Sequence, residues 1–140
     1  MEDYKIWEKF KVEKRLVKEF KHWLVVVRGK QVTLGACVFL LKRGASGLGE
    51  LTVSEAEEFV KSVSWYEEKV KSVFGAERFN YVVAMMKDPY VHYHAFPRYS
   101  KQVEMYNETW IDEAWPKVIE FKDVEVSEEV LASIKAALSD

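Results

Sequence analysis

Cysteine is almost missing from this chain of 140 residues, which contains only Cys37. A single cysteine excludes an internal disulfide framework and fits a reducing compartment, and the apolar residues around Cys37 predict a buried, unreactive thiol. No apolar run approaches the length that spans a membrane, and the N-terminus is charged rather than signal-like. We therefore expect a cytoplasmic protein with no membrane partner.

The chain also has no excess of charge of one sign, because it contains 21 basic and 23 acidic residues and its formal net charge is −2. This balance gives no electrostatic case for binding nucleic acid. The chain is instead rich in apolar residues, with a hydrophobic fraction of 49% and an aromatic fraction of 14%. We expect residues 1–140 to form one domain with a real core, and the aromatic surplus indicates an interface or a base-stacking pocket.

Hydrophobic periodicity divides the chain into helices and short strands. A capping box of Ser54 and Glu57 predicts the start of a central helix, which Gly75 ends. The other expected helices span residues 3–21 and 127–138. The expected strands span residues 23–28, 33–42, 79–86, 90–96 and 103–106. Antiparallel strands with a few helices predict an α+β domain.

Two of the three histidines lie one residue apart, at His92 and His94, in the expected strand 90–96. Alternate side chains of a strand point to the same face, so Tyr90, His92, His94 and Phe96 should line one face. Imidazole titrates near neutrality and can act as a nucleophile, acid or base. The pair, followed by the basic Arg98, therefore favours chemistry on an anion.

Two other interpretations of this pair stay open at the level of the residues alone. His92 and His94 can be partly exposed strand histidines with no task. His-x-His is also common among zinc ligands, but zinc needs a third and usually a fourth ligand, and neither His22 nor Cys37 is spaced to supply one.

The segment Tyr90–Arg98 resembles the signature of the histidine triad superfamily, in which three histidines alternate with apolar residues and Pro-Arg often follows. Residues 78–89 resemble the strand and tight turn that lead into this signature, and residues 31–43 are similar to the family's second strand. The resemblance covers about residues 22–115. It implies a five-stranded antiparallel sheet with flanking helices, and a homodimer in which a two-fold axis joins two such sheets.

The resemblance also implies an activity and a set of site residues. His92 matches the nucleophile, which attacks the α-phosphate of a purine nucleotide and forms a nucleotidyl-histidine. His94 matches the histidine that holds phosphate oxygens, and Asn80 matches a position near the ribose and phosphate. Tyr90 and Arg98 should border the same substrate site, although Asn80 can equally stabilise a turn and Arg98 can equally be solvent-exposed. The expected substrates are dinucleoside polyphosphates or nucleoside phosphoramidates, with no cofactor except Mg²⁺ travelling with a polyphosphate.

Three positions depart from the family pattern. Tyr90 replaces the first histidine, and Ala36 stands where many members carry a further histidine. Met86 stands where the relatives that hydrolyse diadenosine polyphosphates often have asparagine. A tyrosine can still donate a hydrogen bond, so the site need not be lost. The alternative is a catalytically weak protein of this fold that binds a nucleotide or a protein partner.

Overall fold

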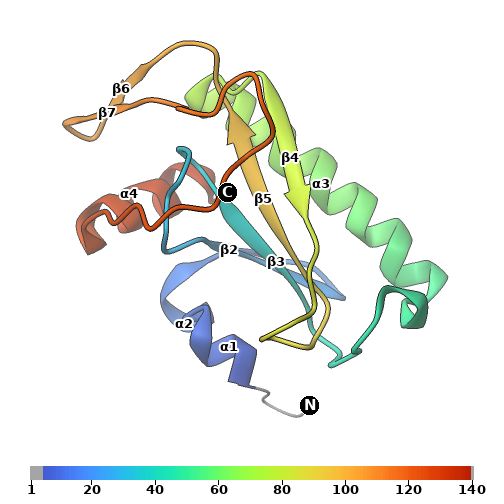
Figure 1. Cartoon of the computed structure of the whole chain (residues 1–140). Coiled ribbons are helices and arrows are strands. Elements are labelled where there is room, and N and C mark those ends of the chain that lie inside the picture. The colour runs from blue at the N-terminus through green and yellow to red at the C-terminus, as the bar shows by residue number, and fades with distance from the viewer. Residues whose placement is uncertain (1–4, 140) are drawn as a thin grey trace.

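The computed structural model describes residues 5–139, which fold into four α-helices, one 3₁₀ turn and seven strands (Figure 1). In chain order the elements are α1 (Lys5–Lys9), α2 (Val12–Arg15), β1 (Leu16–Glu19), β2 (Trp23–Val27), β3 (Cys37–Leu41), the 3₁₀ turn (Leu48–Glu50), α3 (Val53–Phe74), β4 (Arg78–Val82), β5 (His92–Arg98), β6 (Val103–Met105), β7 (Glu108–Trp110) and α4 (Glu128–Leu138). Among the described residues, no helix is long and apolar enough to cross a membrane.

Five of the strands form one antiparallel sheet in the order β1-β2-β3-β5-β4. The sheet and its helices confirm the expected α+β class. One face of the sheet, which includes Trp23 and Phe39, packs against Tyr66 of α3 and Ile134 of α4 in the main core. Cys37 lies in this core, where burial raises the pKa of its thiol, as expected for an unreactive cysteine.

Within residues 5–139, no long helix lies over the opposite face of the sheet. Near β2 and β3, Leu24 and Val38 pack against Phe10 and other apolar residues of the N-terminal segment, residues 5–15. Farther along, Phe96 packs against Ile119 of the C-terminal strap, the irregular residues 111–126 between β7 and α4. Two short pieces from the two ends of the chain therefore cover the face on which the histidines lie.

The N-terminal region corrects the expectation of one helix over residues 3–21. Of these, residues 3 and 4 lie outside the described part of the chain. Lys11 has a left-handed backbone with φ of 52°, which separates α1 from α2, and the chain enters β1 at Leu16. Pairing of β1 with β2 overrides the helical spacing of the apolar residues, because Val17 then faces the core beneath α4.

The expected strand 103–106 is also corrected, because β6 pairs only with β7 in a separate hairpin. Tyr106 and Asn107 have positive φ angles at its turn. The sheet has the expected number of strands, but its fifth member is β1. The N-cap of the central helix is Thr52 and not Ser54, since the Thr52 hydroxyl accepts a hydrogen bond from the Glu55 amide and the Glu55 carboxylate accepts one from the Thr52 amide.

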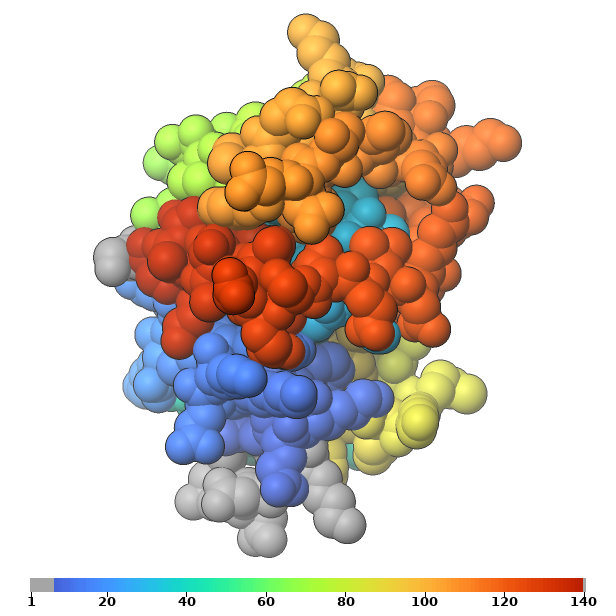
Figure 2. Space-filling view, turned by 90° about the vertical axis from the view of Figure 1, so that its left-hand side faces the viewer, coloured from blue at the N-terminus to red at the C-terminus, as the bar shows by residue number. Residues whose placement is uncertain are grey.

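The two ends of the chain lie together on one side of the molecule. Figure 2 shows the N-terminal segment in blue directly against α4 and the strap in red and orange. Lys14 and Arg15 both form ion pairs with Glu128 at 3.2 Å, at the start of α4. Ser127 caps this helix by accepting a hydrogen bond from the Val130 amide.

Candidate active site

Strand β5 places His92 and His94 on the face that the long helices leave free. Their ring centroids lie 5.1 Å apart at 80°, and the His94 ring lies 6.3 Å from Phe96. Tyr93 points to the other face and stacks on Phe59 of α3 at 4.2 Å. The alternation expected for residues 92–96 is therefore confirmed.

The His92 imidazole is held in one orientation by the backbone. Its Nδ1 lies 2.7 Å from the carbonyl oxygen of Tyr90, and the side chain is only 2% exposed. A carbonyl oxygen can only accept, so Nδ1 carries the ring proton and donates. Nε2 of a neutral His92 then keeps its lone pair, which is the form that a nucleophile requires.

The His94 imidazole has the opposite arrangement. Its Nδ1 accepts a hydrogen bond from Nε of Arg28 at 3.3 Å, so the ring proton of His94 lies on Nε2. Burial and the nearby positive charge of Arg28 lower the pKa of His94 to about 3. His94 is therefore neutral at pH 7 and can donate a hydrogen bond from Nε2.

Arg28 is a site residue that the sequence did not reveal. Its guanidinium carbon lies 5.1 Å from the ring centroids of both Phe96 and Phe121, and Nη1 donates to the Lys30 carbonyl at 2.7 Å. The signal that could have found it is the register of three strands. Val26 pairs with Val38, and Val38 pairs with His94. Arg28 follows Val26 by two residues and so points to the same face as the histidines.

The position of Ala36 helps to explain how Arg28 reaches β5. The Arg28 amide donates to the Ala36 carbonyl, so these two residues are neighbours across β2 and β3. Ala36 is fully buried and packs on Phe96. A methyl group at this position leaves room for the long Arg28 side chain to cross toward His94, and a larger side chain would compete for that room.

Two aromatic rings form a roof over the histidine pair. Phe10 of the N-terminal segment lies 5.8 Å from His92 and 6.1 Å from His94. Phe121 of the strap lies 5.5 Å from His94. An ion pair between Lys9 and Asp88 ties the residue before Phe10 to the turn that precedes β5.

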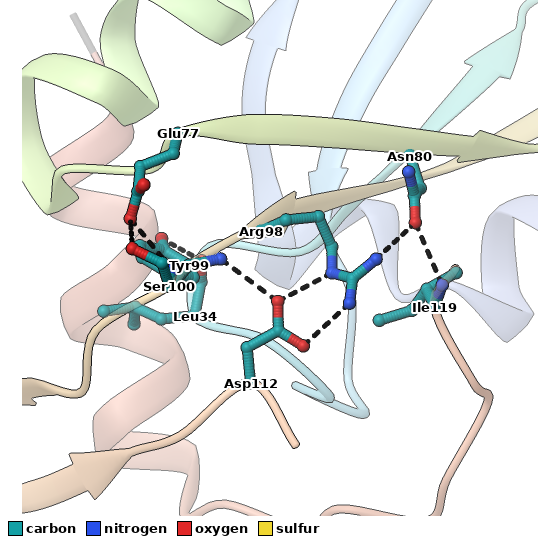
Figure 3. Close-up of polar contacts among 8 residues, drawn as sticks. All are labelled: Leu34, Glu77, Asn80, Arg98, Tyr99, Ser100, Asp112 and Ile119. Carbon is teal, nitrogen blue, oxygen red and sulfur yellow. Dashed lines mark hydrogen bonds and ion pairs between the residues drawn. The ribbon is translucent and has the colours of Figure 1, made fainter. Parts of the chain in front are cut away.

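Arg98 and Asn80 lie on the sheet and form a polar network with Asp112 and Ile119 (Figure 3). Arg98 is 3% exposed, and its Nε and Nη2 donate to the two carboxylate oxygens of Asp112 at 2.7 and 2.9 Å. Its Nη1 donates to Oδ1 of Asn80 at 2.6 Å, and the same oxygen accepts the Ile119 amide at 2.9 Å. Arg98 is therefore not solvent-exposed, and these contacts favour an anchoring role for both residues, because they fasten the strap to the sheet.

The three departures from the expected motif lie in different surroundings. Tyr90 precedes β5, and its half-buried ring packs with Leu24 and Leu40 on the face of the histidines. Met86 is 82% exposed in the loop before β5. In the part of the chain that the structure describes, no three His, Cys, Asp or Glu side chains converge as metal ligands would.

Comparison with known proteins agrees with this geometry at the level of the fold. No protein-family model matches the sequence, and no significant match is found among curated proteins. Among solved structures, a histidine triad protein from Marinobacter aquaeolei VT8 is similar, with a TM-score of 0.73, 21% identity and coverage of 94% of this chain and 90% of that one.

Two further structures support the same conclusion. A histidine triad protein from Sinorhizobium meliloti 1021 has a TM-score of 0.72, 15% identity and coverage of 91% and 90% of the two chains. A hypothetical histidine triad nucleotide-binding protein from Sulfolobus tokodaii strain7 has a TM-score of 0.66, 15% identity and coverage of 89% and 80%. The chain has the fold of histidine triad proteins.

Proposed function

We propose that this protein is a nucleotide phosphohydrolase or nucleotidyl transferase that uses His92 as its nucleophile. The observation that carries the proposal is that the two imidazoles have different hydrogen-bond partners at Nδ1, an acceptor for His92 and a donor for His94. The Tyr90 carbonyl keeps the proton of His92 on Nδ1, and the Arg28 guanidinium keeps the proton of His94 on Nε2. A lone pair and a hydrogen-bond donor are thereby available on neighbouring rings, as attack on a phosphate requires.

The proposed reaction has two displacements at the α-phosphorus. Nε2 of His92 attacks the phosphorus, the bond from phosphorus to the leaving group breaks, and a nucleotidyl-histidine forms. The His94 Nε2–H donates to a phosphate oxygen and stabilises the charge that develops there. Water then attacks the same phosphorus, the bond to His92 breaks, and a nucleoside monophosphate leaves. The step needs no resident metal, although Mg²⁺ can accompany a polyphosphate substrate.

A second candidate is a catalytically weak nucleotide-binding or protein-interaction module. Burial of His92 beneath Phe10 favours this candidate, because a substrate reaches Nε2 only if the roof moves. The loss of imidazole at Tyr90 and Ala36 favours it as well. A homodimer remains our prediction for the assembly under either candidate.

Mass spectrometry of a trapped intermediate separates the two candidates. The protein is incubated with a dinucleoside polyphosphate and a nucleoside phosphoramidate, quenched, and searched for a nucleotide adduct on His92. His92→Ala should abolish the adduct and lower turnover at least about 1000-fold, because the nucleophile is lost. His22→Ala is the matched control, since His22 precedes β2 and lies outside the pair, and it should retain both. Full turnover by His92→Ala would exclude the mechanism, and nucleotide binding without any adduct would favour the second candidate.

A further inference from the structure

The beginning of the described chain covers the proposed nucleophile. The Phe10 ring lies 5.8 Å from the ring of His92 and 6.1 Å from the ring of His94, and His92 is only 2% exposed. A side chain that is covered in this way cannot meet a phosphate until its cover moves. We call α1 together with Phe10, residues 5–10, the N-terminal lid.

The N-terminal lid ends at a residue with an unusual backbone. Lys11 is left-handed, with φ of 52° and ψ of 51°. A residue other than glycine adopts these angles only where its surroundings impose them, and a few such positions are enough to absorb the rotation of a segment. Beyond Lys11 the chain is fastened, because Lys14 and Arg15 of α2 form ion pairs with Glu128 of α4 at 3.2 Å. Lys11 therefore separates the lid from a fastened part of the N-terminal segment.

Two kinds of contact hold the N-terminal lid on the sheet. Trp7 and Phe10 pack on the small apolar cluster that contains Leu24. Lys9 forms an ion pair with Asp88 of the loop before β5, and the two side chains are 46% and 22% exposed. An ion pair that water reaches contributes little free energy. The lid is therefore held mainly by the packing of two aromatic rings.

A hollow of about 1040 Å³ lies beside the N-terminal lid. Its lining includes Trp7 and Glu8 of the lid and Leu16 and Leu24 of the sheet. Protein interiors are close-packed, and a segment inside one moves only if its neighbours move as well. The lid has open space at its flank, so it can turn toward the hollow without displacing packed side chains.

The strap, which carries the other ring of the roof, is fastened more firmly than the lid. Arg98 and Asp112 form a buried ion pair at 2.7 Å, and Asn80 accepts the Ile119 amide at 2.9 Å. Breaking a buried ion pair costs much more free energy than breaking an exposed one. The N-terminal lid is therefore the part of the roof that opens at the lower free energy.

We propose that the N-terminal lid is an autoinhibitory device that turns about Lys11 and closes His92 to ligands until it opens. This inference rests on the proposed function, because it concerns the access of the nucleotide to its nucleophile. Opening breaks the ion pair of Lys9 with Asp88 and moves Phe10 off the imidazole, while the strap and the sheet stay in place. The rate at which a ligand reaches His92 therefore follows the population of the open lid.

Cross-linking of the closed lid tests this inference without any need for turnover. Lys9→Cys with Asp88→Cys joins two positions whose side chains are in contact when the lid is closed, and the buried Cys37 does not compete for the reagent. A short bismaleimide that contains a cleavable disulfide then holds the lid closed. Diethylpyrocarbonate should modify His92 at least about tenfold more slowly in the cross-linked protein than after the linker is cleaved and the reductant removed. Peptide mass spectrometry assigns the modification to His92.

Lys30→Cys with Glu125→Cys is the matched control. These two residues also form an exposed ion pair, at 2.9 Å, but it joins the strap to the residues after β2. Cross-linking the strap should leave the rate of modification of His92 unchanged. Protection of His92 by the strap linker would overturn the inference, and so would a cross-linked lid that leaves His92 as reactive as it is in the cleaved protein.

A single substitution carries the test if circular dichroism shows that the double variant of the lid is not folded. Asp88→Asn removes only the ion pair of the lid, so it should increase the rate of modification of His92 about twofold or more. A rate equal to that of wild type would overturn the inference.

Failure of this inference and failure of the proposed function are distinguishable, because diethylpyrocarbonate reports access to His92 and not turnover. A lid that controls access in a protein that forms no nucleotide adduct would support the lid and refute the nucleophile. An adduct on His92 in a protein whose lid has no effect on access would support the nucleophile and refute the lid.

Discussion

Replacing His94 by glutamine should make the protein more resistant to acid. In the folded chain, burial and Arg28 lower the pKa of His94 to about 3, whereas an unfolded histidine titrates near its usual value of about 6.5. Between these two values the unfolded chain binds a proton that the folded chain excludes. The free energy of unfolding therefore falls as the pH falls through this window, and the stability that neutral His94 permits is fully present above about pH 6.5.

The size of the effect follows from the same two pKa values. At about pH 5 an unfolded histidine is almost fully protonated, while folded His94 is almost fully neutral, so linkage gives a loss of about 2 kcal/mol relative to about pH 8. The pKa of the histidine in the unfolded chain determines most of this free-energy difference. A folded pKa of about 4 in place of about 3 would change the result by only about 0.1 kcal/mol.

Urea unfolding at these two pH values provides the assay. Carboxylates titrate in the same range, but their contribution is common to all variants and cancels when the changes are compared. Between pH 8 and pH 5, wild type should lose about 2 kcal/mol more stability than His94→Gln. His22→Gln is the matched control, because it makes the same substitution at a histidine outside the pair. A difference below about 0.5 kcal/mol, or an NMR titration of the His94 ring with its midpoint near 6.5, would refute the assigned environment.

Two further predictions concern the roof and its anchor. Phe10→Ala should increase the rate at which diethylpyrocarbonate modifies His92 by about tenfold, because Phe10 covers that ring. Phe121→Ala should increase the rate of modification of His94 alone. Equal rates for His92 in wild type and Phe10→Ala would contradict a covering role for Phe10. Asp112→Asn should lower the free energy of unfolding by about 3 kcal/mol or more, because it leaves Arg98 buried without its ion pair. Glu113→Gln removes an exposed ion pair and should cost much less stability than Asp112→Asn, so equal losses for the two variants would contradict the anchor.

The histidine face could be predicted from the sequence because its cause is local. Side chains of a strand alternate, so His92 and His94 had to share a face once the segment was extended. The Tyr90 carbonyl beside His92 could not be predicted, because it depends on how the chain turns before β5. The α+β class could be predicted for a similar reason, since the periods of its long helix and its buried strands are distinct.

The contacts of Arg28 and Arg98 could not be predicted from the sequence. Arg28 is far from the histidines in the chain and meets His94 only through pairing across β2, β3 and β5. The motif predicts Arg98 near the substrate but does not reveal its ion pair with Asp112, because Asp112 lies in an irregular segment without periodicity. Strand β1 cannot be recognised from the sequence, because its apolar residues Leu16 and Val17 also fit the helical spacing of the preceding residues and its strand conformation depends on pairing with β2.

The two faces of the sheet differ in how they are covered, and this difference bears on function. On one face, α3 and α4 bury a continuous apolar core that supplies most of the stability. On the other, two short segments lie over the histidines, where they pack on two small apolar clusters and are also held by ion pairs such as Lys9 with Asp88 and Arg98 with Asp112. Segments that bury less apolar surface than the main core open at lower free energy. The roof can therefore admit a ligand to the histidines while the sheet beneath keeps the imidazoles and Arg28 in place.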